Sequence, residues 1–151
     1  MERIRLSQSH IDLMLRKSIS ALPREACGVI AGRQGSVSRV LTAVNVAGML
    51  HNFAIDPEEL RKMLEEMQSR GEQWLGIWHS HPRSPAIPSA ADIKSARHPH
   101  LVWLIVSLIP GNEAVASRGI SCDGGSVRGY RIDSKRGRFR EICVELAPEY
   151  W

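Results

Sequence analysis

The sequence of 151 residues contains no apolar stretch long enough to cross a membrane. A membrane-spanning helix needs ~20 consecutive apolar residues. The longest apolar run, LVWLIVSLIP at 101–110, has only the length of a strand. The first residues, MERIRLSQSHIDL, carry charges and lack the apolar core and small-residue cleavage site of a signal peptide. We therefore expect a cytoplasmic protein that does not act on membranes.

Cysteine is scarce, and the three cysteines Cys27, Cys122 and Cys143 lie far apart in the sequence. They are odd in number and no CxxC pair is present, so neither a disulfide framework nor a zinc ribbon is indicated. The HxE and PCxxC elements of the nucleobase zinc deaminases are also absent. We expect three reduced and buried thiols.

Internal repeats, low-complexity stretches and long Pro/Gly/Ser linkers are absent as well. A chain of this length can bury roughly 70% of its unfolded surface, so it needs no disulfide to fold. The content of 43% apolar and 24% charged residues is ordinary for a soluble globular protein. Residues 1–151 are therefore expected to form a single domain.

The net charge of +4 and the isoelectric point near 9.3 raise the question of a nucleic-acid partner. Most basic residues are dispersed along the chain, however. The one dense basic run, YRIDSKRGRFR at 130–140, is typical of a β-hairpin whose turn ends at Gly137. We predict no nucleic-acid partner, and we interpret the run as a solvated hairpin tip or as a weak guide for an acidic partner protein.

The clearest predicted helix is DPEELRKMLEEMQSRG, at 56–71. Asp56 is placed to cap it, Pro57 to occupy the first turn, Glu59 to close a capping box and Gly71 to end it.

Apolar periodicity and turn residues predict the remaining elements. In chain order these are a strand at 4–6, a helix within 9–22 (cap Ser9, apolar face Ile11, Leu15, Ile19 and Leu22, end at Pro23), a hairpin of strands at 26–32 and 36–46, a strand at 72–78, a short helix at 89–97, and strands at 101–109, 114–122, 126–132 and 138–146. Helices alternate with strands early and strands dominate late. This order predicts an α/β fold with a mixed β-sheet flanked by helices.

Two histidines stand one residue apart in GIWHSHPRSPAIPSAAD, at 76–92. In a strand, residues i and i+2 share a face, so His79 and His81 would point to one place while Ser80 points away and is hydrogen-bonded beneath them. Pro82 would end the strand and begin a rigid loop.

The helix that follows would begin at Ser89 as its cap, with Asp92 in the first turn. From there the carboxylate could swing back toward the two histidines. Two imidazoles, one carboxylate and an open fourth position are typical of a catalytic zinc site.

A purely structural interpretation stays open at this point. Ser89 and Asp92 satisfy the capping-box pattern by themselves. A second HxH, at His98 and His100, has no matching downstream carboxylate. The presence of a base would favour a catalytic zinc site over a purely structural role, because hydrolysis of an amide needs a group that moves a proton. Glu25, between a proline-containing turn and an apolar strand, is either that base or an exposed glutamate at a strand edge.

Four segments in this order, PREACGVIAG, HNFAIDPEE, GIWHSHPRSPAIPSAAD and LVWLIVSL, resemble the JAMM (MPN+) zinc metalloprotease family. The motif of that family is a glutamate followed by HxH, seven residues beginning with proline, a serine, two residues and an aspartate. The resemblance implies a single-domain α/β MPN (cytidine-deaminase-like) fold over residues 1–151. It also implies one zinc ion per chain.

The resemblance assigns a role to each matching residue. His79, His81 and Asp92 would bind the zinc ion, and Glu25 would be the general acid/base acting on the metal-bound water. Ser89 would stabilise the oxyanion.

The family cleaves peptide or isopeptide bonds at the C-terminal Gly-Gly of ubiquitin-like proteins. This short chain is similar to the small stand-alone bacterial members, which act on a small ubiquitin-like sulfur carrier protein, for example by releasing cysteine from its conjugate. One alternative is a deubiquitinase-like peptidase acting on another ubiquitin-like conjugate. The other is a non-catalytic MPN interaction module, although such modules usually lack some of the metal ligands that this chain retains.

The tryptophans Trp74, Trp78 and Trp103 lie on or beside apolar strands and are predicted in the core, with Trp78 alternatively forming a wall of the metal pocket. Cys27 has the same strand parity as Glu25, but a buried thiol is the preferred interpretation.

Overall fold

The computed structural model describes residues 2–109, 118–122 and 125–148. Within these residues the chain forms three helices and eight strands, and none of the helices is both long enough and apolar enough to cross a membrane. In chain order the elements are β1 (Arg3–Leu6), α1 (Gln8–Ala21), β2 (Cys27–Arg33), β3 (Ser36–Ala43), α2 (Pro57–Ser69), β4 (Gln73–His81), α3 (Ala90–Ser95), β5 (Val102–Ser107), β6 (Ile120–Cys122), β7 (Gly125–Asp133) and β8 (Arg138–Leu146).

The strands form one mixed sheet that closes on itself. Its order is β5-β4-β2-β3-β1-β8-β7-β6, and β7 also pairs with β5. β1 runs parallel to β3 and β8, and β4 runs parallel to β5, whereas the other neighbouring strands are antiparallel. The predicted α/β fold with a mixed sheet and flanking helices is confirmed. The closure through β5 and β7 was not predicted, because a pairing between distant strands leaves no local pattern.

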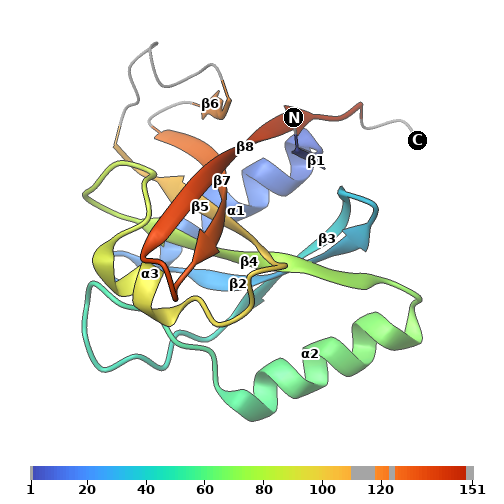
Figure 1. The fold of residues 1–151 in the computed structure, drawn as a ribbon, viewed down its shortest axis with the longest axis horizontal. Helices are drawn as coiled ribbons and strands as arrows, with labels where there is room; N and C mark the ends of the chain where they lie inside the picture. Colours follow the sequence, from blue (N-terminus) through green and yellow to red (C-terminus); the bar gives the residue numbers. More distant parts are fainter. Residues whose placement is uncertain (1, 110–117, 123–124, 149–151) are drawn as a thin grey trace.

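Helix α1 and helix α2 lie on opposite sides of the β2–β4 part of the sheet (Figure 1). On the α1 side, Ile11 and Met14 are fully buried in the largest apolar core, together with Trp78 of β4. On the α2 side, Met67 is buried against Val29 of β2. Each helix thus covers one face of β2 and β4, and β4 carries the two predicted histidines.

The predicted start and apolar face of α1 are wrong in part. Ser7, not Ser9, is the N-cap. Ile19 and Leu22 are 59% and 47% exposed, whereas Ser18 is buried and donates its hydroxyl to a backbone carbonyl one turn earlier. Spacings of three and of four residues both fit one helix face. Whether Ile11, Met14 and Ser18 or Ile11, Leu15 and Ile19 are buried is therefore decided by where the sheet lies.

Helix α2 starts and ends as predicted, with one exception. Asp56 accepts from two backbone N–H groups of the first turn, Pro57 is the first helical residue and Gly71, with φ 68°, follows the last turn. The carboxylate of Glu59 closes no capping box. It accepts instead from the N–H of Val44 in the preceding loop, at 3.0 Å.

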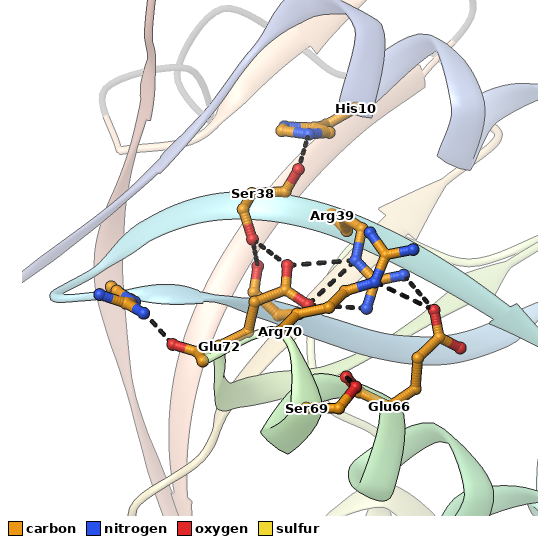
Figure 2. A network of polar contacts seen from close by, with 10 residues as sticks. His10, Ser38, Arg39, Glu66, Ser69, Arg70 and Glu72 are labelled. Carbon is orange, nitrogen blue, oxygen red and sulfur yellow. Dashed lines mark hydrogen bonds and ion pairs between the residues drawn. The ribbon is translucent and has the colours of Figure 1, made fainter.

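A polar network attaches the C-terminal end of α2 to β3. Figure 2 shows the guanidinium of Arg39 between Glu66 and Glu72, with N–O distances of 3.0 Å and 2.7 Å. The side chain of Glu72 is only 11% exposed and also accepts from the Ser38 hydroxyl. A guanidinium–carboxylate pair that is largely shielded from water contributes more than an exposed pair, so the Arg39–Glu72 pair holds the chain just after α2 against β3. Glu66, on α2 itself, is 49% exposed, and its pair contributes less.

The two predicted hairpins are confirmed. The β2–β3 turn contains Gln34 and Gly35, both with positive φ, and the β7–β8 turn contains Gly137 with φ 63°. Strands β7 and β8 match the predictions for 126–132 and 138–146. Of the strand predicted at 114–122, residues 120–122 form β6 and residues 118–119 are not in a strand. Residues 114–117 lie outside the described residues.

Two of the three cysteines can be compared with the prediction of reduced, buried thiols. Cys27 is free and buried, and Cys143 is free and half-buried. The side chain of Cys122 lies outside the described residues.

Gly76→Ala is expected to destabilise the fold, because a Cβ at this position of β4 would lie 2.1 Å from the carbonyl oxygen of Val102 on β5. Relief requires the two parallel strands to separate, at a cost of about 2–3 kcal/mol. Thermal or urea unfolding measures the loss. Gly48→Ala is the matched control, since a Cβ there meets no atom within 4 Å. Equal stability of the two variants would contradict the strand packing described above.

Candidate active site

Strand β4 ends at its two histidines. His79 and His81 lie on the face that carries Ile77 and α3, and Ser80 lies on the face that carries Trp78 and α1. His79 is fully buried and His81 is 3% exposed. As predicted, Ser80 is hydrogen-bonded on the opposite face. Its hydroxyl accepts from the N–H of Ala26, which directly precedes β2, at 2.8 Å.

The segment after β4 turns back and brings Asp92 to the histidines. Its loop is tied to the sheet by the hydroxyl of Tyr130, which donates to the carbonyl of Ala86. Ser89 then caps α3 in a reciprocal capping box: its hydroxyl accepts from the N–H of Asp92 at 3.0 Å, and its own N–H donates to Asp92 Oδ2 at 2.9 Å. The capping box therefore orients the carboxylate.

Three ligand-type atoms meet at one point. His79 Nε2, His81 Nε2 and Asp92 Oδ2 lie 3.1 Å from one another in all three pairs. Three corners of a tetrahedral zinc site with bonds of ~2.0–2.1 Å are about 3.3 Å apart, so this spacing fits one ion. Among the described residues, these three form the only group of metal-ligand side chains found in such an arrangement. The second pair, His98 and His100, is exposed and not part of it.

The hydrogen bonds of His81 indicate that a cation belongs at this point. Its Nδ1 lies 2.8 Å from the carbonyl of Pro85, which assigns the ring proton of the neutral form to Nδ1. The bare Nε2 lone pair then faces Asp92 Oδ2 at 3.1 Å, a repulsive contact unless a proton or a metal ion lies between them. Burial lowers the pKa of His81, but the contacts with Asp92 and Pro85 outweigh it and raise the pKa overall.

Glu25 lies just before β2, next to the same point. The antiparallel register that pairs Cys27 with His79 brings Glu25 alongside His81. Glu25 is 6% exposed, and its Oε1 is buried without a hydrogen-bond partner among the described residues. The alternative of an exposed glutamate at a strand edge is therefore wrong. A buried carboxylate oxygen without a partner requires an explanation.

Burial and hydrogen bonding shift the pKa values of Glu25 and Asp92 in opposite directions. It raises the pKa of Glu25 from 4.5 to about 7, an effect that His81 opposes and Asp92 strengthens. Burial also acts on Asp92, but hydrogen bonds from both histidines outweigh it and hold the pKa of Asp92 far below its usual range. Burial lowers the pKa of His79, which keeps this imidazole neutral, as a metal ligand must be.

Two aromatic side chains surround His79. Phe53, in the loop between β3 and α2, stacks on the imidazole with ring centroids 4.4 Å apart and planes 21° apart. Trp103 of β5 meets it edge-on at 5.6 Å. Trp78 forms no wall of this pocket, because it is fully buried on the α1 face. Phe53 was not predicted as a site residue, and its only signal was its place in the segment HNFAIDPEE.

The structure thus brings all five predicted site residues together: Glu25, His79, His81, Ser89 and Asp92. The hydroxyl of Ser89 accepts from the Asp92 N–H, which leaves its proton available for donation. Its role toward an oxyanion stays a prediction.

The family model of the prokaryotic homologs of the JAB domain (Prok-JAB) matches residues 7–119, well over half of the chain. The chain therefore belongs to this family of small prokaryotic JAB (JAMM/MPN) proteins. The resemblance found in the sequence is confirmed.

Curated relatives match more than half of the chain. It is 35% identical over 91 residues to a desampylase from Pyrococcus furiosus, 39% over 94 residues to a probable TtuB-protein conjugate cleaving protease from Thermus thermophilus, and 34% over 87 residues to the CysO-cysteine peptidase of Mycobacterium tuberculosis. These alignments cover 60%, 62% and 56% of this chain. They span 65%, 60% and 60% of the relatives, which is less than two thirds of each.

Solved structures match over nearly the whole chain. A protein from Desulfitobacterium hafniense is 31% identical with a TM-score of 0.80, covering 97% of this chain and 94% of that one. A JAB1/MPN domain protein from Archaeoglobus fulgidus has a TM-score of 0.54 at 18% identity, covering 96% and 99% of the two chains. The second likeness shows the fold alone. Together they confirm the predicted MPN fold.

Glu25→Gln is expected to stabilise the metal-free protein at alkaline pH. The pKa of Glu25 is raised in the fold, so ionisation opposes folding. This cost is absent well below pH 4.5, grows as pH rises and is complete above about pH 7. Between pH 5 and pH 8 the stability of the variant relative to wild type should rise by about 2–3 kcal/mol. Urea unfolding of both proteins at pH 5 and at pH 8, in the presence of a metal chelator, measures this difference in the free energy of unfolding.

The exposed Glu65 of α2 provides the control for this pH series. Glu65→Gln should show no comparable gain between the two pH values. A gain of the same size in both variants would mean that net charge, and not burial of Glu25, is responsible.

Proposed function

We propose that the protein is a zinc-dependent hydrolase that cleaves the peptide or isopeptide bond at the C-terminal Gly-Gly of a small ubiquitin-like sulfur carrier protein, for example releasing cysteine from its conjugate. The convergence of His79, His81 and Asp92 beside the unpartnered carboxylate of Glu25 carries this proposal. The names of the relatives support the substrate class, since they denote a desampylase, a conjugate-cleaving protease and a CysO-cysteine peptidase. We further propose that residues 1–151 form one JAMM/MPN+ domain that acts in the cytoplasm.

In this proposal His79, His81 and Asp92 hold one zinc ion per chain. Zinc in such a site supplies a Lewis acid and a water whose pKa falls to about 7. Glu25 accepts a proton at its buried carboxylate and returns it to the leaving nitrogen. The burial of Glu25 beside His81, with no hydrogen-bond partner for its Oε1 among the described residues, supports this role. Ser89 donates its hydroxyl proton toward the developing oxyanion.

The metal assignment predicts one zinc ion per chain in the purified protein. His79→Gln removes one of the three ligand atoms and should lose most of the bound zinc after dialysis, as measured by inductively coupled plasma mass spectrometry. His98→Gln, in the second and exposed HxH pair, should keep the wild-type content. If both variants retain equal zinc, His79 is not a ligand.

Glu25→Gln is expected to keep its zinc but to lose turnover by about 10²–10⁴-fold, because removal of a general acid/base has an effect of this size. Mass spectrometry of a Gly-Gly-tailed carrier carrying a C-terminal cysteine follows the released carrier. Glu65→Gln, on the exposed side of α2, serves as the active control.

The outcomes separate the proposed functions. Hydrolysis by Glu25→Gln at the wild-type rate would remove this residue from the reaction. A zinc-loaded wild-type protein that cleaves only ubiquitin-like conjugates other than sulfur carriers would be a deubiquitinase-like peptidase. One that binds such proteins without cleaving them would be an interaction module.

A further inference from the structure

One side-chain amide holds together the loop between β3 and α2. Nδ2 of Asn45 donates to the carbonyls of Glu25, at 2.9 Å, and of Asn52, at 3.1 Å. Its Oδ1 accepts from the N–H groups of Ala47, at 3.0 Å, and of Ala54, at 3.1 Å. A primary amide offers two donor hydrogens and two acceptor lone pairs, so the full hydrogen-bonding capacity of Asn45 is used.

Three of these four bonds act directly on parts of the candidate active site. One holds the backbone of Glu25, which lies beyond the first β2–β4 pair and therefore outside the regular ladder. Two others hold Asn52 and Ala54, the residues on either side of Phe53. Phe53 is the ring stacked on His79. The amide of Asn45 thus links the backbone of Glu25, the proposed base, to the backbone on either side of Phe53.

Apolar packing does little to place the first part of this loop. Four of its apolar side chains are at least half exposed, namely Val44 (64%), Val46 (53%), Met49 (64%) and Leu50 (50%). The position of this first part therefore depends mainly on hydrogen bonds. The Asn45 side chain makes four of them, and the Arg24 guanidinium adds bonds to the carbonyls of Asn45 and Ala47. Loss of a partner inside such a shared network costs more than one exposed hydrogen bond.

We propose that Asn45 is a positioning residue for the hydrolytic reaction, because its amide holds Glu25 and Phe53 in a fixed relation to His79. The inference rests on the proposed function and adds a residue outside the metalloprotease motif. Asn45 touches no ligand atom of the metal site, so it acts through the backbones that it binds.

Asn45→Asp provides the sharpest test, because it preserves shape and the two acceptor contacts but loses both donors. The carbonyls of Glu25 and Asn52 would then face a carboxylate. We expect kcat to fall about 10–100-fold, the range typical of residues that orient catalytic and ligand groups. KM should change by less than about threefold, because a residue that orients the base acts on the chemical step and not on substrate binding. Zinc content should stay at one per chain.

The matched control is Glu59→Ala, which removes the bond from the Val44 N–H and so loosens the same loop without touching Glu25 or the neighbours of Phe53. It should lower the unfolding temperature but leave kcat unchanged. Asn45→Ala, which removes all four bonds, should reproduce the kcat loss if it folds. Equal kcat losses in Asn45→Asp and Glu59→Ala, or a fully active Asn45→Asp, would overturn the proposal.

Hydrogen–deuterium exchange of the metal-free protein gives a second readout that needs no turnover. In Asn45→Asp, exchange should accelerate both in the segment around Glu25 and in residues 52–54, whereas Glu59→Ala should accelerate it only near Val44. Unchanged exchange around Glu25 would refute the link by itself. If the wild-type protein binds no zinc and cleaves no conjugate, the proposed function fails, and the exchange result still decides whether Asn45 couples the two backbones.

Discussion

The antiparallel ladder between β2 and β4 is the constraint on which the candidate active site depends. It pairs Cys27 with His79 and so brings Glu25 alongside His81, although 54 residues separate Glu25 from His79 in the sequence. The alternation of a strand then divides the side chains between two faces, with Ser80 on the α1 face and the histidines on the face with α3. A shift of this register by one residue would move both histidines into the α1 core.

The capping box of α3 and the proposed metal site share one atom, Oδ2 of Asp92. Asp92 Oδ2 accepts from the Ser89 N–H and also lies 3.1 Å from each histidine. The structural interpretation of this stretch is therefore confirmed, and the same contacts are compatible with the proposed metal site. The helix needs an acceptor at its first turn, and the same hydrogen bond orients the carboxylate toward the histidines.

The site carries polar atoms that the fold does not satisfy. Glu25 Oε1 and His79 Nδ1 are buried without hydrogen-bond partners among the described residues. Such groups destabilise a fold and are retained where chemistry requires them. The surroundings offset this cost with strong local contacts: the aromatic rings of Phe53 and Trp103 around His79, and the saturated amide of Asn45 next to Glu25.

The sequence by itself determined the features that rest on local spacing: the HxH pair at a strand end, the capping box at Ser89 and Asp92, the start and end of α2 and both hairpin turns. A period of two in strands and specific residues at helix ends are properties of neighbouring residues, so they can be read without a fold. Tertiary structure alone decided which residues of α1 are buried, that β5 and β7 close the sheet, and that Trp103 and Phe53, not Trp78, enclose His79. It also decided that Glu25 is buried and that Asn45 joins it to the loop of Phe53, because contacts between distant segments depend on how the sheet and helices pack.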